Sequence, residues 1–388
     1  MEIEKLKENF VSIYGNYGEI RGFMAPGRVN LIGEHIDYNG GHVFPCAITF
    51  GNYCIARKRD DLKLRFYSEN FKELGIIEVD LNNLKYEEKD NWTNYPKGVF
   101  ATFIKHGYKI NHGFDIYVFG NIPGSGLSSS AAMEVVISNL IKDYFSIDID
   151  DVEIAKYSQE AEVKFCHMNC GIMDQFASAN GKKDKAIFLD CNTLKYEYVP
   201  LVLKGYKLIV TNSNKPHSLV TSKYNDRRKE CEEALHDLQT KLNIKSLCEL
   251  SVDEFEANKH LIKTETNRIR ASFAIYEEDR TKKAVIALQN NDYGTFGKLL
   301  NESGDGLHYQ YDATCFEIDT LVDLARKQKG CLGSRETGGG WGGNTISLVK
   351  EECVDEFKEN LEKEYFKKTK LKAGVNILQV GEGGRRIF

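Results

Sequence analysis

The sequence lacks the features that would place it in a membrane, on a secretory route or on nucleic acid. No stretch is long and apolar enough to span a bilayer, and the charged first ten residues lack the apolar run of a signal peptide. The formal net charge of −5 gives no general attraction to nucleic acid, so an anionic ligand needs a local site. We therefore expect a cytoplasmic protein that binds neither membrane nor nucleic acid.

Cysteine pairs with metal-binding spacing are also missing. The 10 cysteines are scattered without a C-x-x-C pair, and a chain of 388 residues can bury a core without disulfides. Cys166, His167 and Cys170 resemble half of a zinc site, but no second half with ligand spacing follows. We interpret these cysteines as reduced residues packed in the core.

The chain mixes strand-like and helix-like segments without repeats, which is typical of the α+β class. Short apolar or alternating runs predict strands at 62–66, 114–118, 206–212, 345–349 and 376–380. Apolar periodicity predicts helices at 131–145, 150–165 (with Asp150 as N-cap), 218–242, 318–327 and 354–365. Strand-like alternation is frequent in the first half of the sequence, whereas charged helical segments follow after about residue 200. This change in pattern predicts two domains, residues 1–203 and 204–388.

The strongest local signal is a corner rich in glycine and serine, residues 120–132, between a predicted strand and an apolar helix. Glycines let backbone N–H groups turn inward, and the first turn of a helix carries unpaired N–H groups and partial positive charge. This glycine corner therefore favours phosphate binding, and its serine hydroxyls suit phosphate oxygens or a metal. A flexible linker is the alternative, but linkers rarely join a strand directly to an apolar helix. The corner is neither a Walker A motif nor G-x-G-x-x-G.

Three further segments carry chemical groups that also have structural explanations. Residues 25–41 contain an arginine, two carboxylates and a histidine, which suit sugar hydroxyls and a phosphoryl group but also an ordinary surface loop. Residues 338–343 contain five glycines in six positions, which indicate either close backbone approach to a ligand or a mobile loop. Asp174 could be a general base or a helix cap, and Glu162 could be a solvated side chain.

Taken together and in this order, these segments resemble the GHMP kinases, and within them the galactokinases. Residues 28–41 are similar to the galactokinase signature nearly throughout, residues 123–132 look like the GHMP nucleotide loop, and residues 338–343 look like the third GHMP glycine motif. Further likeness lies at 211–214, 217–218 and Tyr224. The resemblance implies a GHMP kinase fold, with an N-terminal domain like ribosomal protein S5 domain 2 and a ferredoxin-like C-terminal domain.

The resemblance also implies an activity. It is the ATP-dependent phosphorylation of D-galactose at the anomeric hydroxyl, which gives α-D-galactose 1-phosphate and opens the Leloir pathway. Mg²⁺ would be the cofactor and ATP the co-substrate, and we expect a monomer. Phosphoryl transfer suits such a site because it depends on positioning and charge neutralisation.

Roles for single residues follow from the same resemblance. Asp174 would accept the proton of the anomeric hydroxyl, while Arg28 would keep Asp174 ionised and stabilise the transferring phosphoryl group. Ser130 and Glu162 would hold Mg²⁺. The galactose contacts would be Glu34, His35, Asp37, Gly171 and Tyr224, with Asp37 contacting the axial C4 hydroxyl. The ATP contacts would be Ser68, Gly124, Ser125, Gly126, Leu127, Ser128, Ser129 and Ser130.

The sequence departs from the family's pattern at a few places, and other functions remain open. The departures are Ile36, Trp341, Asn344 and the segment 302–312; none replaces a proposed catalytic group, but they bear on sugar preference. A related sugar 1-kinase would act on N-acetylgalactosamine or arabinose. A non-catalytic galactose sensor would lack a Ser-Ala pair in the nucleotide loop, whereas Ser130-Ala131 is present here. A plain nucleotide-binding module would not need the carboxylates at 34–37.

Overall fold

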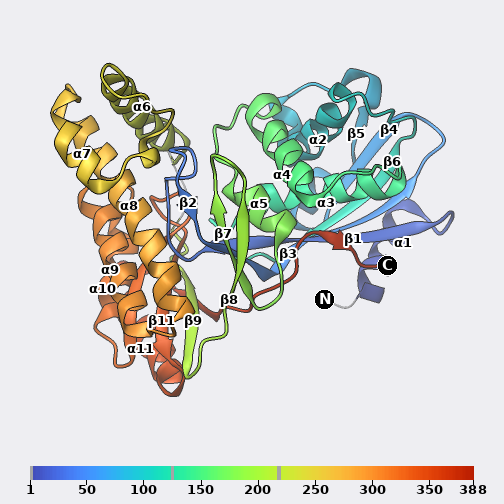
Figure 1. Cartoon of the computed structure of the whole chain (residues 1–388). Helices are drawn as coiled ribbons and strands as arrows, with labels where there is room; N and C mark the ends of the chain where they lie inside the picture. Colours follow the sequence, from blue (N-terminus) through green and yellow to red (C-terminus); the bar gives the residue numbers. More distant parts are fainter. Residues whose placement is uncertain (1–2, 124–125, 216–219) are drawn as a thin grey trace.

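The computed structural model describes residues 3–123, 126–215 and 220–388. Its first part is built on a six-stranded sheet in the order β13-β1-β3-β6-β4-β5, antiparallel except for the β4–β6 pair. The strands are β1 (Ile20–Asn30), β3 (Pro45–Lys58), β4 (Lys63–Ser68), β5 (Ile77–Asp80), β6 (Phe114–Gly120) and β13 (Arg385–Arg386). Strands β1 and β3 are the long central ribbons of this half (Figure 1).

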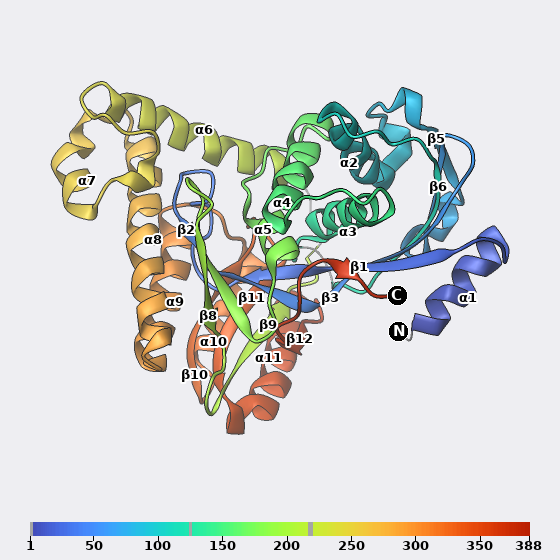
Figure 2. The ribbon, with the colours of Figure 1, turned by 45° about the vertical axis from the view of Figure 1, so that its right-hand side comes forward.

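Helices cover both faces of this sheet (Figure 2). One face is packed by α2 (Asn94–Lys105), α3 (Ser129–Tyr144), α4 (Asp151–Glu160) and α5 (Met173–Asn180), and the other by α1 (Ile3–Tyr14). A small sheet in the order β2-β7-β8 lies beside it, formed by β2 (His42–Val43), β7 (Lys185–Asp190) and β8 (Tyr196–Pro200).

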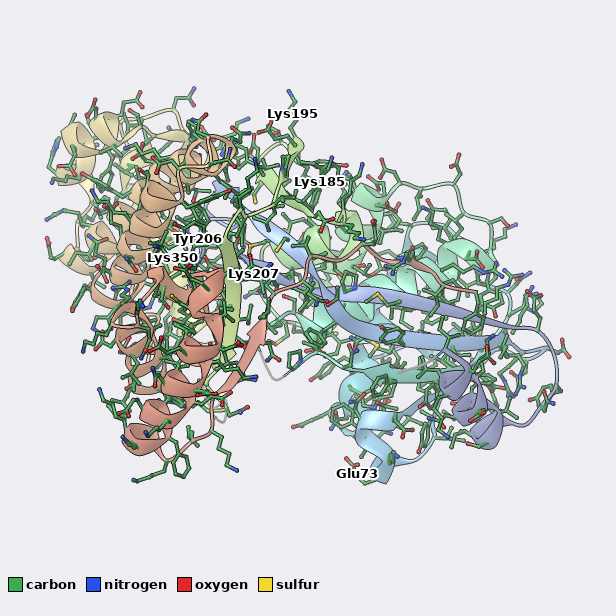
Figure 3. The ribbon with its side chains drawn as sticks, turned by 90° about the horizontal axis from the view of Figure 1, so that it is seen from below. Glu73, Lys185, Lys195, Tyr206, Lys207 and Lys350 are labelled. Atoms are coloured by element: carbon green, nitrogen blue, oxygen red, sulfur yellow. The ribbon has the colours of Figure 1, made fainter. Side chains whose placement is uncertain are left out.

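The second part is an antiparallel four-stranded sheet in the order β10-β11-β9-β12. Its strands are β9 (Tyr206–Asn212), β10 (Cys331–Thr337), β11 (Asn344–Lys350) and β12 (Gly374–Ile377). Its helices are α6 (Val220–Gln239), α7 (Val252–Asn258), α8 (Glu265–Gln289), α9 (Tyr293–Tyr309), α10 (Phe316–Arg326) and α11 (Val354–Thr369). Figure 3 shows Tyr206, Lys207 and Lys350 on this half of the molecule and Glu73 on the other.

The alternation of side chains along β9 explains how helices cover both faces of the second sheet. Leu208 and Val210 pack with α8 and α9, whereas Ile209 between them packs with α10 and α11. The cluster around α8 and α9 also contains Val29 and Phe44 from the first part of the chain. The two sheets therefore meet in this one of the apolar clusters, while the helix-covered face of the first sheet has its own.

Most elements match the sequence predictions, and the α+β class is confirmed. Asp150 caps α4 by accepting the Glu153 N–H at 2.8 Å, and one π-helical turn, Ala161–Phe165, continues that helix. The strand expected at 376–380 is wrong in its bounds, because β12 ends at Ile377 and Val380 pairs instead with Ile48. The last residues then return to the first sheet as β13.

The strand positions can be compared with the predicted domains, residues 1–203 and 204–388, but they do not fix a boundary between the two. The four-stranded sheet is formed within residues 206–377, while Arg385 and Arg386 pair with β1. A boundary between residues 203 and 204 stays a prediction. Among the described residues, no helix combines the length and apolarity needed to cross a bilayer.

Candidate active site

The glycine corner joins β6 to α3. Helix α3 begins at Ser129, and Ser128 before it has a left-handed backbone with φ of 61°. The Ser128 hydroxyl is buried and has no partner among the described residues. The corner lies against β1, where the Arg28 N–H donates to the Leu127 carbonyl at 3.2 Å. The first turn of α3 therefore offers N–H groups beside β1, in an arrangement suited to an anion.

The predicted ATP contacts lie on or beside this corner where the structure describes them. Gly126, Leu127, Ser128, Ser129 and Ser130 belong to the corner, and Gly124 and Ser125 lie outside the described residues. Ser68 ends β4, and its hydroxyl accepts from the Asn70 N–H at 3.2 Å. The Asn70 side chain in turn bonds the backbone of Gly120 at 2.9 and 2.7 Å. Ser68 is thus linked to the first residue of the corner, and its contact with ATP stays a prediction.

Arg28 and Asp174 form a bidentate ion pair between β1 and the first turn of α5. The guanidinium donates from Nε to Oδ1 at 2.8 Å and from Nη2 to Oδ2 at 3.0 Å. Nη1 donates to the Gly126 carbonyl at 3.0 Å. Arg28 is 3% exposed, while the Asp174 side chain is 30% exposed. The arginine therefore lies behind the carboxylate and links it to the glycine corner.

A cavity of about 170 Å³ opens beside this ion pair. It is lined by the predicted site residues Arg28, His35, Asp37, Gly171, Asp174 and Tyr224, together with Met168, Asn169, Cys170, Met173, Asn225, Gly338 and Gly339. Segments far apart in the sequence thus converge on one pocket. Cys166 is buried, as predicted, whereas Cys170 was expected in the core and instead lines the pocket.

Asp37 and Gly171 form one wall of the pocket. A Cβ atom on Gly171 would lie 1.8 Å from the Asp37 carboxylate, so only glycine allows this contact. The Tyr38 N–H donates to Asp37 Oδ1 at 3.0 Å. Burial, and then the negative charge of Asp174, raise the pKa of Asp37 to about 6. A carboxyl of this kind is a strong hydrogen-bond acceptor for a hydroxyl in the pocket.

His35 is buried in the same wall within an aromatic cage. The cage consists of Tyr38, Tyr224, Tyr311 and Trp341, whose ring centroids lie 4.9–6.0 Å from the imidazole. His35 Nδ1 and the Tyr38 hydroxyl are 2.8 Å apart, and Nε2 has no well-formed hydrogen bond among the described residues. Burial, and then the charge of Arg227, lower the pKa of His35 to about 3. The ring is therefore neutral, and the Gly339 backbone also lies close to it.

Glu34 lies behind the pocket. Its buried carboxylate pairs with Arg335 on β10 and accepts the Gly338 N–H at 3.1 Å. The Thr337 hydroxyl lies 3.3 Å from the same carboxylate. Glu34 does not line the cavity. Through these contacts, Glu34 joins the loop around His35 to the third glycine loop. A direct contact between Glu34 and the sugar stays a prediction.

Glu162 lies on the π-helical turn, close to α3. The Gln175 side chain donates to Glu162 at 2.5 Å and to Glu134 at 3.0 Å, which ties the two buried carboxyls together. The pKa of Glu162 is raised to about 7, chiefly by burial and then by the charge of Asp174. A hydrogen bond with Ser130 opposes part of this rise. Within the described ranges, no group of three or more His, Cys, Asp and Glu side chains is placed to hold a metal. Ser130 and Glu162 are oxygen donors of the kind that Mg²⁺ prefers, so the pair fits the predicted site.

The third glycine loop, residues 338–343, packs against the glycine corner. Gly338 has φ of 101°, and a Cβ atom there would lie 2.8 Å from the Gly126 carbonyl. Trp341 anchors the loop by donating its indole N–H to the Asp312 carbonyl at 2.9 Å and its backbone N–H to the Ala313 carbonyl. Two departures from the family pattern, Trp341 and the segment 302–312, therefore contact each other.

Sequence reasoning missed several residues that shape the site. They are Glu134, Gln175, Arg227, Tyr311 and Arg335. Arg335 and Glu34 are 301 residues apart, so no local pattern connects them. Gln175 is next to Asp174, and its position beside a candidate base was the one signal that could have marked it.

Comparisons with known proteins agree with this geometry. The galactokinase galactose-binding signature matches residues 8–58, the GHMP kinases N terminal domain matches residues 94–182, and the GHMP kinases C terminal domain matches residues 284–368. The chain is 50% identical to a galactokinase of Fusobacterium nucleatum subsp. nucleatum, over 99% of this chain and 100% of that protein. It is 46% identical to a galactokinase of Bacillus subtilis, over 99% of both.

Solved structures give the same result. The crystal structure of Lactococcus lactis galactokinase complexed with galactose superimposes with a TM-score of 0.96 at 44% identity, covering 98% of this chain and 99% of that one. A mevalonate kinase structure, with a TM-score of 0.63 and 18% identity over 93% of this chain and 100% of that one, shares the fold alone. The fold and the paired glycine loops thus define a GHMP kinase. Within that class, the full-length identity places the chain in the galactokinase family, and the predicted GHMP kinase fold is confirmed.

Proposed function

We propose that this chain transfers the γ-phosphoryl group of ATP to the anomeric hydroxyl of D-galactose, giving α-D-galactose 1-phosphate. The observation that carries the proposal is the Arg28–Asp174 pair, which lines a pocket together with His35 and Asp37. Arg28 also links this pair to the glycine corner through the Gly126 carbonyl. Membership of the galactokinase family supports galactose as the sugar.

Asp174 is placed to act as the base. Its carboxylate is partly exposed and lines the pocket, while both of its oxygens accept hydrogen bonds from Arg28. A carboxylate placed in this way can take the proton of a hydroxyl as the phosphoryl group arrives. Because Arg28 also reaches the Gly126 carbonyl, its charge lies between the acceptor side and the glycine corner. We assign it to stabilise the phosphoryl group in transfer.

The glycine corner and its neighbours are proposed to hold the nucleotide. The N–H groups at the start of α3 and the Ser128 hydroxyl suit the phosphates of ATP. Ser130 and Glu162 would hold Mg²⁺, which when bound neutralises charge on the phosphates. Replacing Ser130 with alanine should therefore weaken the use of Mg-ATP more than the binding of sugar.

Sugar selectivity is proposed to come from Asp37 and His35. Asp37 is fixed against Gly171 and accepts hydrogen bonds, and neutral His35 lines the same pocket. A site of this kind rejects an epimer because its buried polar groups then lose their partners. We assign Asp37 to the axial C4 hydroxyl, which distinguishes galactose from glucose.

We further propose a cytoplasmic monomer with domains at residues 1–203 and 204–388. All ten cysteines are unpaired, which suits a reducing compartment.

The test is ATP consumption by the purified chain with Mg²⁺ and one sugar at a time. Galactose, N-acetylgalactosamine, arabinose and glucose are compared. We expect turnover with galactose to exceed turnover with the other three. A higher kcat/KM for N-acetylgalactosamine or arabinose would assign a related sugar kinase instead. Binding of galactose and ATP without turnover would indicate a sensor.

A further inference from the structure

Two consecutive glutamates on α8 hold the two ends of the loop that carries Glu34, His35 and Asp37. We propose that Glu277 and Glu278 are positioning residues for galactose recognition, acting through the 33–42 loop. This inference rests on the proposed function, because it names what sets the geometry of the sugar side of the pocket. Helix α8 belongs to the second part of the chain and runs beside β2, where the loop ends (Figures 1 and 2).

Glu277 fixes the first residue of the loop. Its Oε1 atom accepts the Gly33 N–H at 3.0 Å and the Ser303 hydroxyl at 2.6 Å. Its Oε2 atom accepts the Arg280 Nε–H at 2.8 Å. Glu277 has no exposed surface, so these bonds form away from water, where a carboxylate bond to a backbone N–H is strong. Ser303 belongs to the segment 302–312, which departs from the family pattern.

Glu278 fixes the last residue of the loop. Its Oε2 atom accepts the His42 N–H at 2.6 Å, and its Oε1 atom lies 2.7 Å from His42 Nδ1. Burial alone would raise the pKa of Glu278, but the hydrogen bonds from His42 hold it below the usual range. The carboxylate is therefore charged when it holds the loop.

Glycines at both ends of the loop let the helix approach. Gly33 has φ of 99°, and a Cβ atom there would lie 3.1 Å from the Thr281 hydroxyl on α8. A Cβ atom on Gly41 would lie 3.0 Å from Glu278 Oε2. The two glutamates thus contact backbone on each side of the residues that face the sugar. A loop held at both ends keeps His35 and Asp37 in place at a lower entropic cost on binding.

The experiment measures binding of galactose and of ATP separately, by calorimetry, in Glu277→Ala, Glu278→Ala and the wild type. Each alanine variant should weaken galactose binding about tenfold or more, which is the loss expected for a buried charge-assisted hydrogen bond. ATP binding should change by less than about twofold, because within the described residues the hydrogen bonds of the two glutamates go to other parts of the chain than the glycine corner. Glu277→Gln should recover part of the affinity, since its amide oxygen can still accept from Gly33.

A matched control separates positioning from loss of stability. Asp237 on α6 is also a buried carboxylate that accepts a backbone N–H, from Lys263 at 3.0 Å, and its ion pair is also with Lys263 and not with the 33–42 loop. Asp237→Ala should lower the melting temperature without changing galactose affinity. If Glu277→Ala does not fold, Glu278→Ala and Glu277→Gln carry the test.

The outcomes distinguish this inference from the proposed function. Galactose affinity that is unchanged in the variants, or that falls together with ATP affinity, would overturn the positioning role and leave the kinase assignment intact. A wild-type chain that binds no galactose would overturn both.

Discussion

At the scale of single residues, Glu336 is a buried carboxyl group that forms no salt bridge within the described part of the chain. It lies on β10 and is 1% exposed, while Arg335 beside it pairs with Glu34. Neither of its oxygens has a well-formed hydrogen bond among the described residues, although the Gly342 N–H lies near. Burial therefore raises the pKa of Glu336 well above its usual value. This residue makes the stability of the fold depend on pH.

Glu336→Gln should raise the melting temperature at pH 8. The unfolded chain releases this proton near pH 4.5, whereas the folded chain keeps it to a higher pH, so folding loses free energy as pH rises through that interval. Removing the charge should restore about 1–2 kcal/mol at pH 8 and almost nothing at pH 4. Calorimetric melting from pH 4 to pH 8 measures this, with the exposed Glu359→Gln as control. An equal gain at both pH values would contradict the explanation.

At the scale of elements, the contact between the two glycine loops determines how the corner meets the rest of the site. Gly338 has a backbone conformation that favours glycine, and it leaves no space for a side chain against the Gly126 carbonyl. The corner therefore depends on a loop that lies about 200 residues away in the sequence. A substitution there should affect the nucleotide side of the pocket first.

Gly338→Ala should raise the KM for ATP more than the KM for galactose. The added methyl group would push the loop away from the corner, in addition to about 1 kcal/mol of backbone strain. Steady-state kinetics with each substrate varied in turn measures the two constants. Gly205→Ala is the matched control, because Gly205 has φ of 75° with open space around it. Equal changes in both variants would show that the strain, not the clash, is responsible.

The same scale shows which parts of the molecule could be predicted from sequence. The glycine corner, α3 and the Asp150 cap were predicted because each depends on residues a few positions apart. The hydrogen bond between Gly33 and Glu277 joins residues that are 244 positions apart, and a single sequence contains no pattern that connects these two residues. The end of β12 was misplaced because residues 379–381 bond to β3 of the first sheet instead of continuing along β9. Sequence patterns over a few residues thus predicted the helices and strands, whereas the family resemblance predicted which distant segments come together in the site.

At the scale of the whole molecule, the last residues connect the two parts of the chain. After β12, the chain crosses to the first sheet, where Arg385 and Arg386 pair with β1. The Phe388 ring packs on Gly22 and lies 4.3 Å from Lys7 Nζ on α1. Helix α1 and the last residues of the chain therefore lie side by side (Figures 1 and 2).

Removal of residues 385–388 should destabilise the fold with little effect on chemistry. The deletion exposes the edge of β1 and the apolar surface under Phe388, which should cost about 1–3 kcal/mol. The melting temperature should fall, while kcat below the new transition should stay within about twofold. A large loss of kcat at low temperature would instead show that the end of the chain helps to place Arg28 on β1.

The most direct measurement is turnover by Asp174→Asn, alongside galactose binding by calorimetry. The amide keeps the shape of the carboxylate but cannot accept the proton, so kcat should fall by about 10²–10⁴ while galactose affinity changes little. Asp143→Asn, in the last turn of α3 and paired with Arg21, is the control. Turnover near that of the wild type in Asp174→Asn, with galactose still bound, would contradict the role of Asp174 as the base.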